Sequence, residues 1–364
     1  MHRLQRVVTD SILDSPATYA RLDPEGLVGR IAALPDQIDS AWRVAQEIAL
    51  PGMWGPFDSM AVLGMGGSAI GGALLRAIAS GMPMAAPVEI VRGYALPSNV
   101  GIDTLVFASS NSGDTEETVA ALTAAKHVGC HCVVIATGGR LLEIARKESM
   151  LALQYDWDAE PRSALGWSFA PLLALAGRFG LLPDLGHEIA AATVEMRAMV
   201  AALGRDVPEA SNPAKQLARR LAGKLPVIVA SDALAPVAYR WRTQINENAK
   251  SWAIAEELPE MNHNAPLGYG APAAVVPTLH AVLLRHASMH PRNQRRVDLT
   301  VEQMRDAGVG AEVLEIAGSS VLAQMLCAIQ FGDFASYYLG LLNGVLPSPM
   351  DALAWIKQRM AASG

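Results

Sequence analysis

The chain has 364 residues, 51% of them hydrophobic and 18% charged, so it is long enough for two α/β domains and can bury a large core. This composition excludes an intrinsically disordered chain, and a net charge of −6 argues against nucleic acid as a partner. Any site for an anion must therefore be positive locally rather than across the whole surface.

Apolar runs and cysteines indicate neither a membrane anchor nor a metal centre. No apolar run reaches the roughly 20 residues of a bilayer span, and the segment Met1–Arg6 lacks the apolar core of a signal peptide. Three cysteines, Cys130, Cys132 and Cys327, are too few and badly spaced for a zinc site or a disulfide framework. We expect a reduced, cytoplasmic protein that binds no membrane, no metal and no other cofactor.

Residues 1–50 read as helices, with breaks at Leu13–Pro16 and at Leu34–Pro35. From about Ser59, strands, small-residue turns and helices alternate, which is the pattern of a parallel sheet covered by helices on both faces. The expected strands of this first unit are 60–64, 87–92, 104–109 and 131–137, and its expected helices are 69–80, 115–128, 141–147 and 168–182.

A second unit with a similar alternation of strands, turns and helices begins near Asn212. Its expected strands are 225–230, 275–276, 281–285 and 311–316, and its expected helices are 235–250 and 293–307. The likeness of the two units predicts a duplicated, doubly wound α/β domain. The tail 321–360 reads as two helices separated by Leu346–Pro349.

Two glycine- and serine-rich turns, each after an apolar strand-like run and before a helix, carry the strongest functional signal. The first is Gly64–Gly72, and the second, here called the hydroxyl-rich loop, is Ser109–Thr115. Such turns present bare backbone N–H groups to an anion at a helix start, and glycine permits close approach. Four hydroxyls without a lysine or P-loop spacing suit one phosphate monoester better than a nucleoside triphosphate.

Other interpretations of these turns remain open. Gly64, Gly66 and Ala69 also satisfy the dinucleotide pattern G-x-G-x-x-A, which by itself is a weak signal. That pattern requires an acidic residue closing the next strand, whereas the expected strand 87–92 ends in Arg92. The hydroxyl-rich loop alone could be an ordinary turn, but two such turns at neighbouring strand ends favour a binding site.

The densest polar segment outside these turns is 246–264. In it Glu247 stands between two asparagines, as a carboxylate oriented for proton transfer would; a salt bridge to Lys250 is the structural alternative. His263 lies in a turn between two asparagines rather than on an apolar helix face, which favours a functional role. Arg162 follows the strands of the first unit, where α/β folds bind ligands, although a solvated charge is the commoner role of a single arginine.

With these motifs the sequence resembles the bifunctional phosphoglucose/phosphomannose isomerase family, a branch of the sugar-isomerase (SIS) fold. The matching segments are, in chain order, GMGGSAIGG (64–72), SSNSGDTEET (109–118), EPRSALG (160–166), NENAK (246–250), ELPEMNHN (257–264) and LLNGVLPSPMDALAWIK (341–357). The resemblance implies two doubly wound parallel-sheet SIS subdomains with flanking helices. The implied boundaries are a helical segment 1–58, subdomains 59–185 and 186–345, and a C-terminal helix in 346–364 that closes the active site.

The implied activity is a metal-independent aldose–ketose isomerisation that converts glucose 6-phosphate, and mannose 6-phosphate as well, to fructose 6-phosphate through a cis-enediolate. Under the resemblance Glu247 is the base, Arg162 steadies the enediolate, His263 opens the sugar ring from the partner subunit of a homodimer, and Lys357 assists ring opening. The residues implied to bind the substrate are Gly66, Gly67, Ser68, Ser110, Ser112, Thr115 and Ser348.

The sequence departs from the family pattern at three places. The family often has Asp-Pro-Thr where this chain has Leu346–Ser348, and an Asp is common where Gly93 stands; the basic segment 286–296 has no counterpart. These differences bear on substrate preference and rate rather than on the reaction class.

A non-catalytic SIS regulator that binds a sugar phosphate is the main alternative function. Such a protein usually carries a DNA-binding module, and the sequence shows no helix-turn-helix signal with a basic face. An aminotransferring sugar-phosphate synthase is excluded, because its nucleophilic Cys would follow Met1, where His2 stands.

Overall fold

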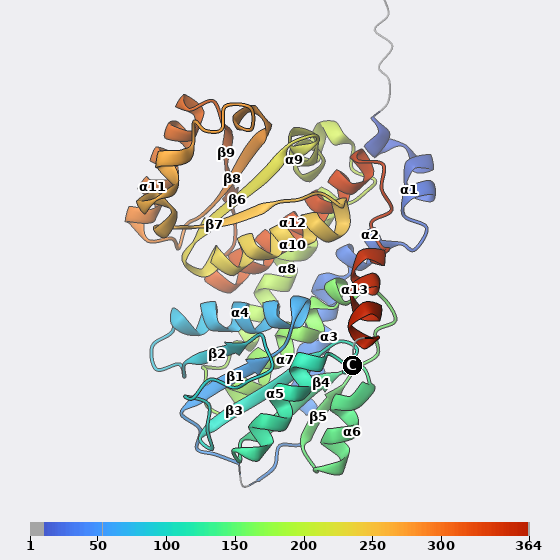
Figure 1. Cartoon of the computed structure of the whole chain (residues 1–364), viewed down its shortest axis with the longest axis vertical. Helices are drawn as coiled ribbons and strands as arrows, with labels where there is room; N and C mark the ends of the chain where they lie inside the picture. The colour runs from blue at the N-terminus through green and yellow to red at the C-terminus, as the bar shows by residue number, and fades with distance from the viewer. Residues whose placement is uncertain (1–10, 53, 363–364) are drawn as a thin grey trace, which may run out of the picture.

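Residues 11–52 and 54–362 are described by a computed structural model, in which two parallel sheets occupy two lobes with helices between and outside them (Figure 1). The expected class, α/β with two doubly wound parallel sheets and flanking helices, is confirmed. The domain boundaries given above stay a prediction. Of the segments expected to be helical, residues 1–10 and 363–364 lie outside the described residues.

The first sheet has five parallel strands in the order β2-β1-β3-β4-β5. Its elements are β1 (Ser59–Leu63), β2 (Val88–Val91), β3 (Thr104–Ser110), β4 (His131–Ala136), β5 (Leu151–Gln154), α4 (Gly66–Ser80), α5 (Glu116–His127), α6 (Gly139–Lys147) and α7 (Leu165–Arg178). Leu105 and Phe107 of β3 share a buried cluster with α4 and α7, whereas Val106 and Ala108 share one with α5 and α6. All of β3 is buried because helices cover both faces of the sheet.

The second sheet has four parallel strands in the order β7-β6-β8-β9. Its elements are β6 (Leu225–Ser231), β7 (Ile254–Leu258), β8 (Leu279–His286), β9 (Gly310–Ile316), α10 (Ala235–Ala249) and α11 (Pro291–Asp306). Taken in chain order, β6 to β9 occupy the places that β1 to β4 occupy in the first sheet. This shared order agrees with the duplication that the two sequence units predicted.

The remaining helices pack between the sheets and along one side (Figure 1). They are α1 (Pro16–Leu22), α2 (Leu27–Ala32), α3 (Leu34–Glu47), α8 (Gly186–Leu203), α9 (Pro213–Leu221), α12 (Val321–Leu342) and α13 (Asp351–Ala361). Helices α4 and α10 lie against each other between the two lobes. The start of α10 and the end of α4 line one cavity, so the two helices run in opposite directions.

One expected strand was wrong, and four helices and strands were not anticipated. The segment 275–276 leads into a 3-10 turn, Val276–Thr278, because Pro277 has no N–H to donate to a ladder, and the strand begins at Leu279. The unanticipated helices and strands are β5, β7, α8 and α9. Strands β5 and β7 are edge strands with polar or half-exposed residues, so they lack the apolar runs of the central strands.

Helix α12 is the central core helix of the protein. Among the described helices it is the one whose length and composition would suit a bilayer, and 94% of its most apolar window is buried inside the protein. Its Gly332 permits close packing, since a Cβ there would lie 2.1 Å from Trp241 Nε1 of α10. That burial is the pattern of a core helix rather than of a membrane span.

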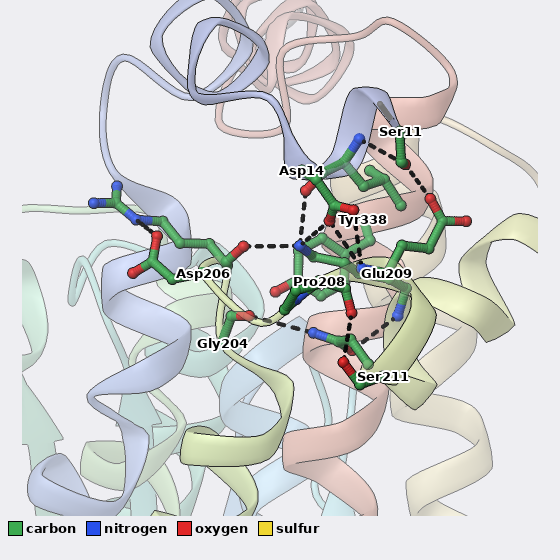
Figure 2. Close-up of polar contacts among 12 residues, drawn as sticks. Ser11, Asp14, Gly204, Asp206, Pro208, Glu209, Ser211 and Tyr338 are labelled. Carbon is green, nitrogen blue, oxygen red and sulfur yellow. Dashed lines mark hydrogen bonds and ion pairs between the residues drawn. The ribbon is translucent and has the colours of Figure 1, made fainter. Parts of the chain in front are cut away.

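A buried lysine ties the N-terminal helices to the rest of the fold. The Lys215 ammonium on α9 is fully buried and donates to Leu13 O at 2.7 Å, to Asp14 Oδ1 at 3.0 Å and to Arg205 O at 2.7 Å. Asp14 also accepts from the backbone N–H of Glu209 at 2.8 Å, and Figure 2 shows these two residues close to Tyr338 of α12. Burial of this charge is tolerated because every ammonium donor has an oxygen partner.

We predict that Lys215→Met lowers the free energy of unfolding by about 3–5 kcal/mol, because it leaves oxygen atoms unpaired in the interior. Chemical denaturation measures the loss. The matched control is Arg220→Met, which removes an exposed ion pair to Glu312 and should cost at most about 1 kcal/mol. Equal losses in the two variants would contradict the structural role of Lys215.

Candidate active site

The guanidinium of Arg162 is the centre of the candidate site. Arg162 lies in the short 3-10 turn before α7, and its side chain is 3% exposed. Its Nε donates to Asn248 Oδ1 at 2.7 Å, and its Nη2 donates to Pro347 O at 2.8 Å. Its buried Nη1 has no hydrogen-bond partner among the described residues and lies 3.6 Å from Glu247 Oε2. One donor is therefore free beside a carboxylate.

Glu247 lies in the last turn of α10, with its side chain 30% exposed. Burial raises the pKa of this carboxyl, and the neighbouring Arg162 guanidinium opposes that effect. Burial likewise lowers the pKa of Arg162. A carboxylate held in this way is a stronger base than one on the surface, which suits proton transfer near neutral pH.

The alternative ion pair between Glu247 and Lys250 does not form. Lys250 ends α10 in the left-handed conformation, with φ of 50°, and its ammonium turns back along the helix. It donates to the main-chain oxygens of Glu247, Pro347 and Pro349 at 2.5, 2.8 and 2.6 Å. Lys250 therefore fixes the loop before α13 and leaves the Glu247 carboxylate to Arg162.

Asn248 fixes the orientation of Arg162, and Ser348 lies beside the same guanidinium. Asn248 is fully buried, and its Nδ2 donates to Ser336 Oγ of α12 at 2.9 Å, so its Oδ1 must face the guanidinium. Ser348, predicted to bind substrate, is buried next to this pair, and its Oγ lies 3.5 Å from Arg30 Nη2. The Asn248 side chain of α10 and main-chain oxygens of the loop before α13 thus contact one guanidinium, and Ser336 of α12 holds the Asn248 amide in place.

The hydroxyl-rich loop joins β3 to α5 and is closed by its own hydroxyls. Ser110 Oγ lies 2.8 Å from Thr115 Oγ1 and accepts from Gly113 N at 3.2 Å, while Ser112 Oγ accepts from Asp114 N at 3.3 Å. Gly113 has φ of 75°, and a Cβ there would lie 1.9 Å from Gly138 O. Only glycine fits this position, so the loop conformation depends on it.

The glycine turn at the start of α4 lies between this loop and Arg162. Gly66, Gly67 and Ser68 form the first turn of the helix, where main-chain N–H groups lack helical partners. A Cβ on Gly67 would lie 3.5 Å from Pro161 O, and a Cβ on Gly64 would lie 3.0 Å from Ser109 O. The structure therefore brings the predicted substrate-binding residues and the Arg162–Glu247 pair to one edge of the first sheet.

His263 and Lys357 are not brought to this edge. His263 is exposed in the 3-10 turn Glu260–His263 after β7. The five residues of β7 separate that turn from the end of α10, a span of about 16 Å in an extended strand. Lys357 lies on α13, whose described side chains are exposed, and no described hydrogen bond or ion pair joins it to Arg162 or Glu247.

Sequence reasoning did not anticipate the ion pairs that surround Arg162. Arg240 of α10 pairs with Asp333 of α12 at 2.7 Å, and its Nη2 donates to Arg162 O at 3.2 Å. Arg30 of α2 pairs with the buried Glu160 at 2.8 Å. One signal was available, since Asp333 is the single charged residue in the apolar helix 321–342 and a buried charge needs a partner.

Taken together, the site offers a base with a raised pKa and a guanidinium donor that can stabilise negative charge on an oxygen. Hydroxyls and helix N-termini nearby are suited to an anion. Within the described ranges there is no group of three or more His, Cys, Asp or Glu side chains that could hold a metal ion.

Comparison with known proteins agrees with this geometry. A family model described as the bacterial phospho-glucose isomerase C-terminal SIS domain matches residues 210–360. A bifunctional phosphoglucose/phosphomannose isomerase from Caldicellulosiruptor bescii is 36% identical, over 90% of this chain and 97% of its own length. One from Aquifex aeolicus is 30% identical, over 84% and 91%. The crystal structure of a hypothetical protein from Thermus thermophilus is similar in fold, with a TM-score of 0.70 and 18% identity over 96% of this chain and 93% of that one.

We predict that Glu247→Gln is more stable to unfolding than the unaltered protein at about pH 8 and loses this advantage towards pH 4. Below the unfolded-state pKa the carboxyl is protonated in both states, so it carries no ionisation penalty. As the pH rises through the raised pKa of the folded state, the native protein must ionise a buried group.

Denaturation curves of both proteins across this pH range measure the difference. Glu302→Gln, an exposed change on α11, is the control and should show no such trend. An advantage that shrinks as the pH rises would mean that the fold stabilises the Glu247 carboxylate.

Proposed function

Because the chain belongs to the bifunctional phosphoglucose/phosphomannose isomerase family, we propose that it interconverts glucose 6-phosphate and mannose 6-phosphate with fructose 6-phosphate. The main structural support for this reaction is that Arg162 Nη1 has no hydrogen-bond partner among the described residues and lies 3.6 Å from the Glu247 carboxylate. A base beside a cationic donor is what proton abstraction next to a carbonyl requires. We place this enzyme of sugar phosphate metabolism in the cytoplasm.

In this proposal Glu247 removes the proton from C2 of the open-chain aldose. The C2–H electron pair becomes the C1–C2 double bond, and the carbonyl π electrons move onto O1. Arg162 Nη1 donates to the resulting enediolate oxygen, and its other donors stay on Asn248 and Pro347. The hydroxyl proton on O2 moves to O1, Glu247 returns the abstracted proton to C1, and the C2 carbonyl of the ketose forms. A proton delivered to either face of C2 in the reverse direction yields glucose or mannose 6-phosphate.

The phosphate group is bound by the hydroxyl-rich loop and by Ser68, with the main-chain N–H groups of Gly66 and Gly67 at the start of α4. Hydroxyl and N–H donors bind a phosphate dianion through charge-assisted hydrogen bonds and need no lysine. The short separation of Ser110 and Thr115 Oγ atoms supports one shared anion. Ser348, buried beside Arg30, borders the sugar end of the site.

Helix α13 carries Lys357 to the sugar and closes the site. The helix is exposed along its described length, so it can move without uncovering a core. Its preceding loop is anchored by bonds from Arg162 and Lys250 to Pro347 O. Closure about that anchor would bring Lys357 to the sugar for its proposed role in ring opening.

A homodimer completes the site, with His263 of each chain serving the partner's Glu247. Two observations support this arrangement. His263 is exposed and separated from Glu247 of its own chain by the length of β7. Several large apolar side chains of α13 are also exposed, as expected for a surface covered in an assembly: Leu353, Trp355, Ile356 and Met360.

The competing function, a sugar-phosphate-binding regulator, needs the phosphate-binding loops but not the base. The Arg162–Glu247 geometry favours the enzyme, because binding alone gives no reason to keep an acidic group with a raised pKa beside a buried cation.

We predict that the protein exchanges a carbon-bound proton of fructose 6-phosphate with solvent in deuterated buffer that contains EDTA. Proton NMR follows the label at C1 of the ketose and at C2 of the aldose products. Glu247→Gln should lower turnover about 10²–10⁴-fold, because the amide lacks the basic lone pair, while ligand binding persists.

Glu302→Gln serves as the control and should keep full exchange. More than about a tenth of normal turnover in Glu247→Gln would rule out Glu247 as the base. Loss of exchange on adding EDTA to the unaltered protein would contradict metal independence.

We also predict that two inactive variants, Glu247→Gln and His263→Ala, regain activity when their subunits exchange. In an equal mixture half of the dimers are mixed and each has one intact site, so turnover should reach about a quarter of normal. Each variant incubated alone is the control. No recovery, with exchange shown by native mass spectrometry, would place His263 in its own chain's site or outside the reaction.

A further inference from the structure

A cavity of about 1150 Å³ lies between the carboxyl edge of the second sheet and helix α4. Its lining includes the polar residues Arg76, Arg92, Asp232, Glu257, His286 and Ser320. Its lining includes neither Arg162 nor Glu247 nor any residue of the hydroxyl-rich loop. The volume is ample for a hexose phosphate, since pockets for small ligands are roughly 300–1,000 Å³.

The cavity occupies the second sheet's equivalent of the proposed active site. β6 and β8 stand where β1 and β3 stand in the first sheet, and ligands of such sheets bind at the carboxyl ends of these strands, where the strand order reverses. The connection from β8 to α11 takes the place of the hydroxyl-rich loop. It begins the basic segment 286–296, which had no counterpart in the family, and contributes Ser288 and His290 to the lining.

His286 lines this cavity and has an unused acceptor. The side chain is 2% exposed, and its Nδ1 lies 2.9 Å from Gln324 Oε1. Gln324 Nε2 donates to Gly318 O, so the oxygen of the amide faces the imidazole and Nδ1 carries the proton. Nε2 is buried without a partner among the described residues, and burial lowers the pKa of His286 and keeps the ring neutral. A ligand hydroxyl would satisfy Nε2.

Cationic groups line the same cavity. The guanidinium groups of Arg76 on α4 and Arg92 after β2 make no hydrogen bond or ion pair within the described ranges, although the charge of Arg76 acts on Glu257. The guanidinium of Arg92 lies 5.3 Å from the centre of the Tyr239 ring. The N-terminus of the 22-residue α12 opens here as well, with Val321 and Leu322 in the lining. Ser320 caps this end by accepting from Ala323 N. Two guanidinium groups and a long helix N-terminus favour a phosphate.

The carboxylates of the cavity differ in availability. Asp232 already accepts from Ser231 Oγ, His290 N and Asn293 Nδ2, so its charge is satisfied by the protein. Glu257 and Glu188 also line the cavity and have no described hydrogen-bond partner. A simple anion would leave these acceptors and His286 Nε2 unpaired, whereas sugar hydroxyls would donate to them.

We infer that the carboxyl edge of the second sheet is a second, non-catalytic binding site for a phosphorylated sugar or polyol. Its phosphate binds Arg76, Arg92 and the start of α12, and its hydroxyls donate to His286 Nε2 and Glu257. The ligand therefore shares its chemistry with the substrate, but the phosphate is bound by arginines here and by hydroxyls in the first sheet.

The test uses glucitol 6-phosphate, which has no carbonyl group to isomerise, titrated calorimetrically into the full-length protein. We expect two molecules bound per chain. Arg76→Gln and Arg92→Gln should each weaken one of the two about tenfold or more, leave the other unchanged, and leave the initial isomerisation rate at low substrate unaltered. Arg43→Gln, an exposed change on α3, is the matched control and should keep both.

Two comparison ligands separate the sources of affinity. Inorganic phosphate and unphosphorylated glucitol should each bind the arginine-dependent site at least tenfold more weakly than glucitol 6-phosphate. Equal affinity for inorganic phosphate would refute the role of His286 and Glu257. One molecule per chain, unaffected by Arg76→Gln or Arg92→Gln, would overturn the second site, and it would leave the isomerase proposal standing because isomerisation is measured separately.

Discussion

Burial of the Arg162 guanidinium is the constraint on which the candidate site depends. A buried cation is strongly destabilising unless oxygen atoms surround it, and here they come from Asn248 on α10, from the Pro347 carbonyl and from the Glu247 carboxylate. Three segments distant in the chain must therefore meet before the charge is tolerated. The same bonds leave the buried Nη1 without a hydrogen bond, so the packing that stabilises the arginine also keeps one of its nitrogens unpartnered beside the Glu247 carboxylate.

The neighbouring ion pair of Arg240 and Asp333 extends this constraint into the core. It joins α10 to α12 and gives the main-chain oxygen of Arg162 a donor. Because α12 is buried along most of its length, the position of the guanidinium is tied to the core of the protein. A preorganised donor of this kind costs little reorganisation when charge develops on a substrate oxygen.

The two sheets share a strand order, but different types of side chain lie at their carboxyl edges. The first edge has small side chains, glycine and hydroxyls, where a ligand can approach the backbone closely, and its charged pair comes from elements packed beside it. The second edge has arginine, histidine and glutamate around an open cavity. Opposed packing of α4 and α10 gives each edge a helix end from the other half, so neither edge is built from one sheet alone.

The sequence by itself determined the alternation of strands and helices, because central strands covered on both faces must be apolar and turns before helices must be small and polar. It also pointed to Arg162 and the hydroxyl-rich loop, which follow strands of the first unit, and to Glu247, which stands between two asparagines in a polar segment. Polar edge strands such as β7 gave no apolar signal, and Pro277 broke an expected strand.

Only the tertiary structure decided that Glu247 faces Arg162 rather than Lys250, that Asn248 orients the guanidinium, and that His263 lies across β7 from its own Glu247. These contacts join residues far apart in the chain, and their partners are chosen by packing, which no local pattern contains.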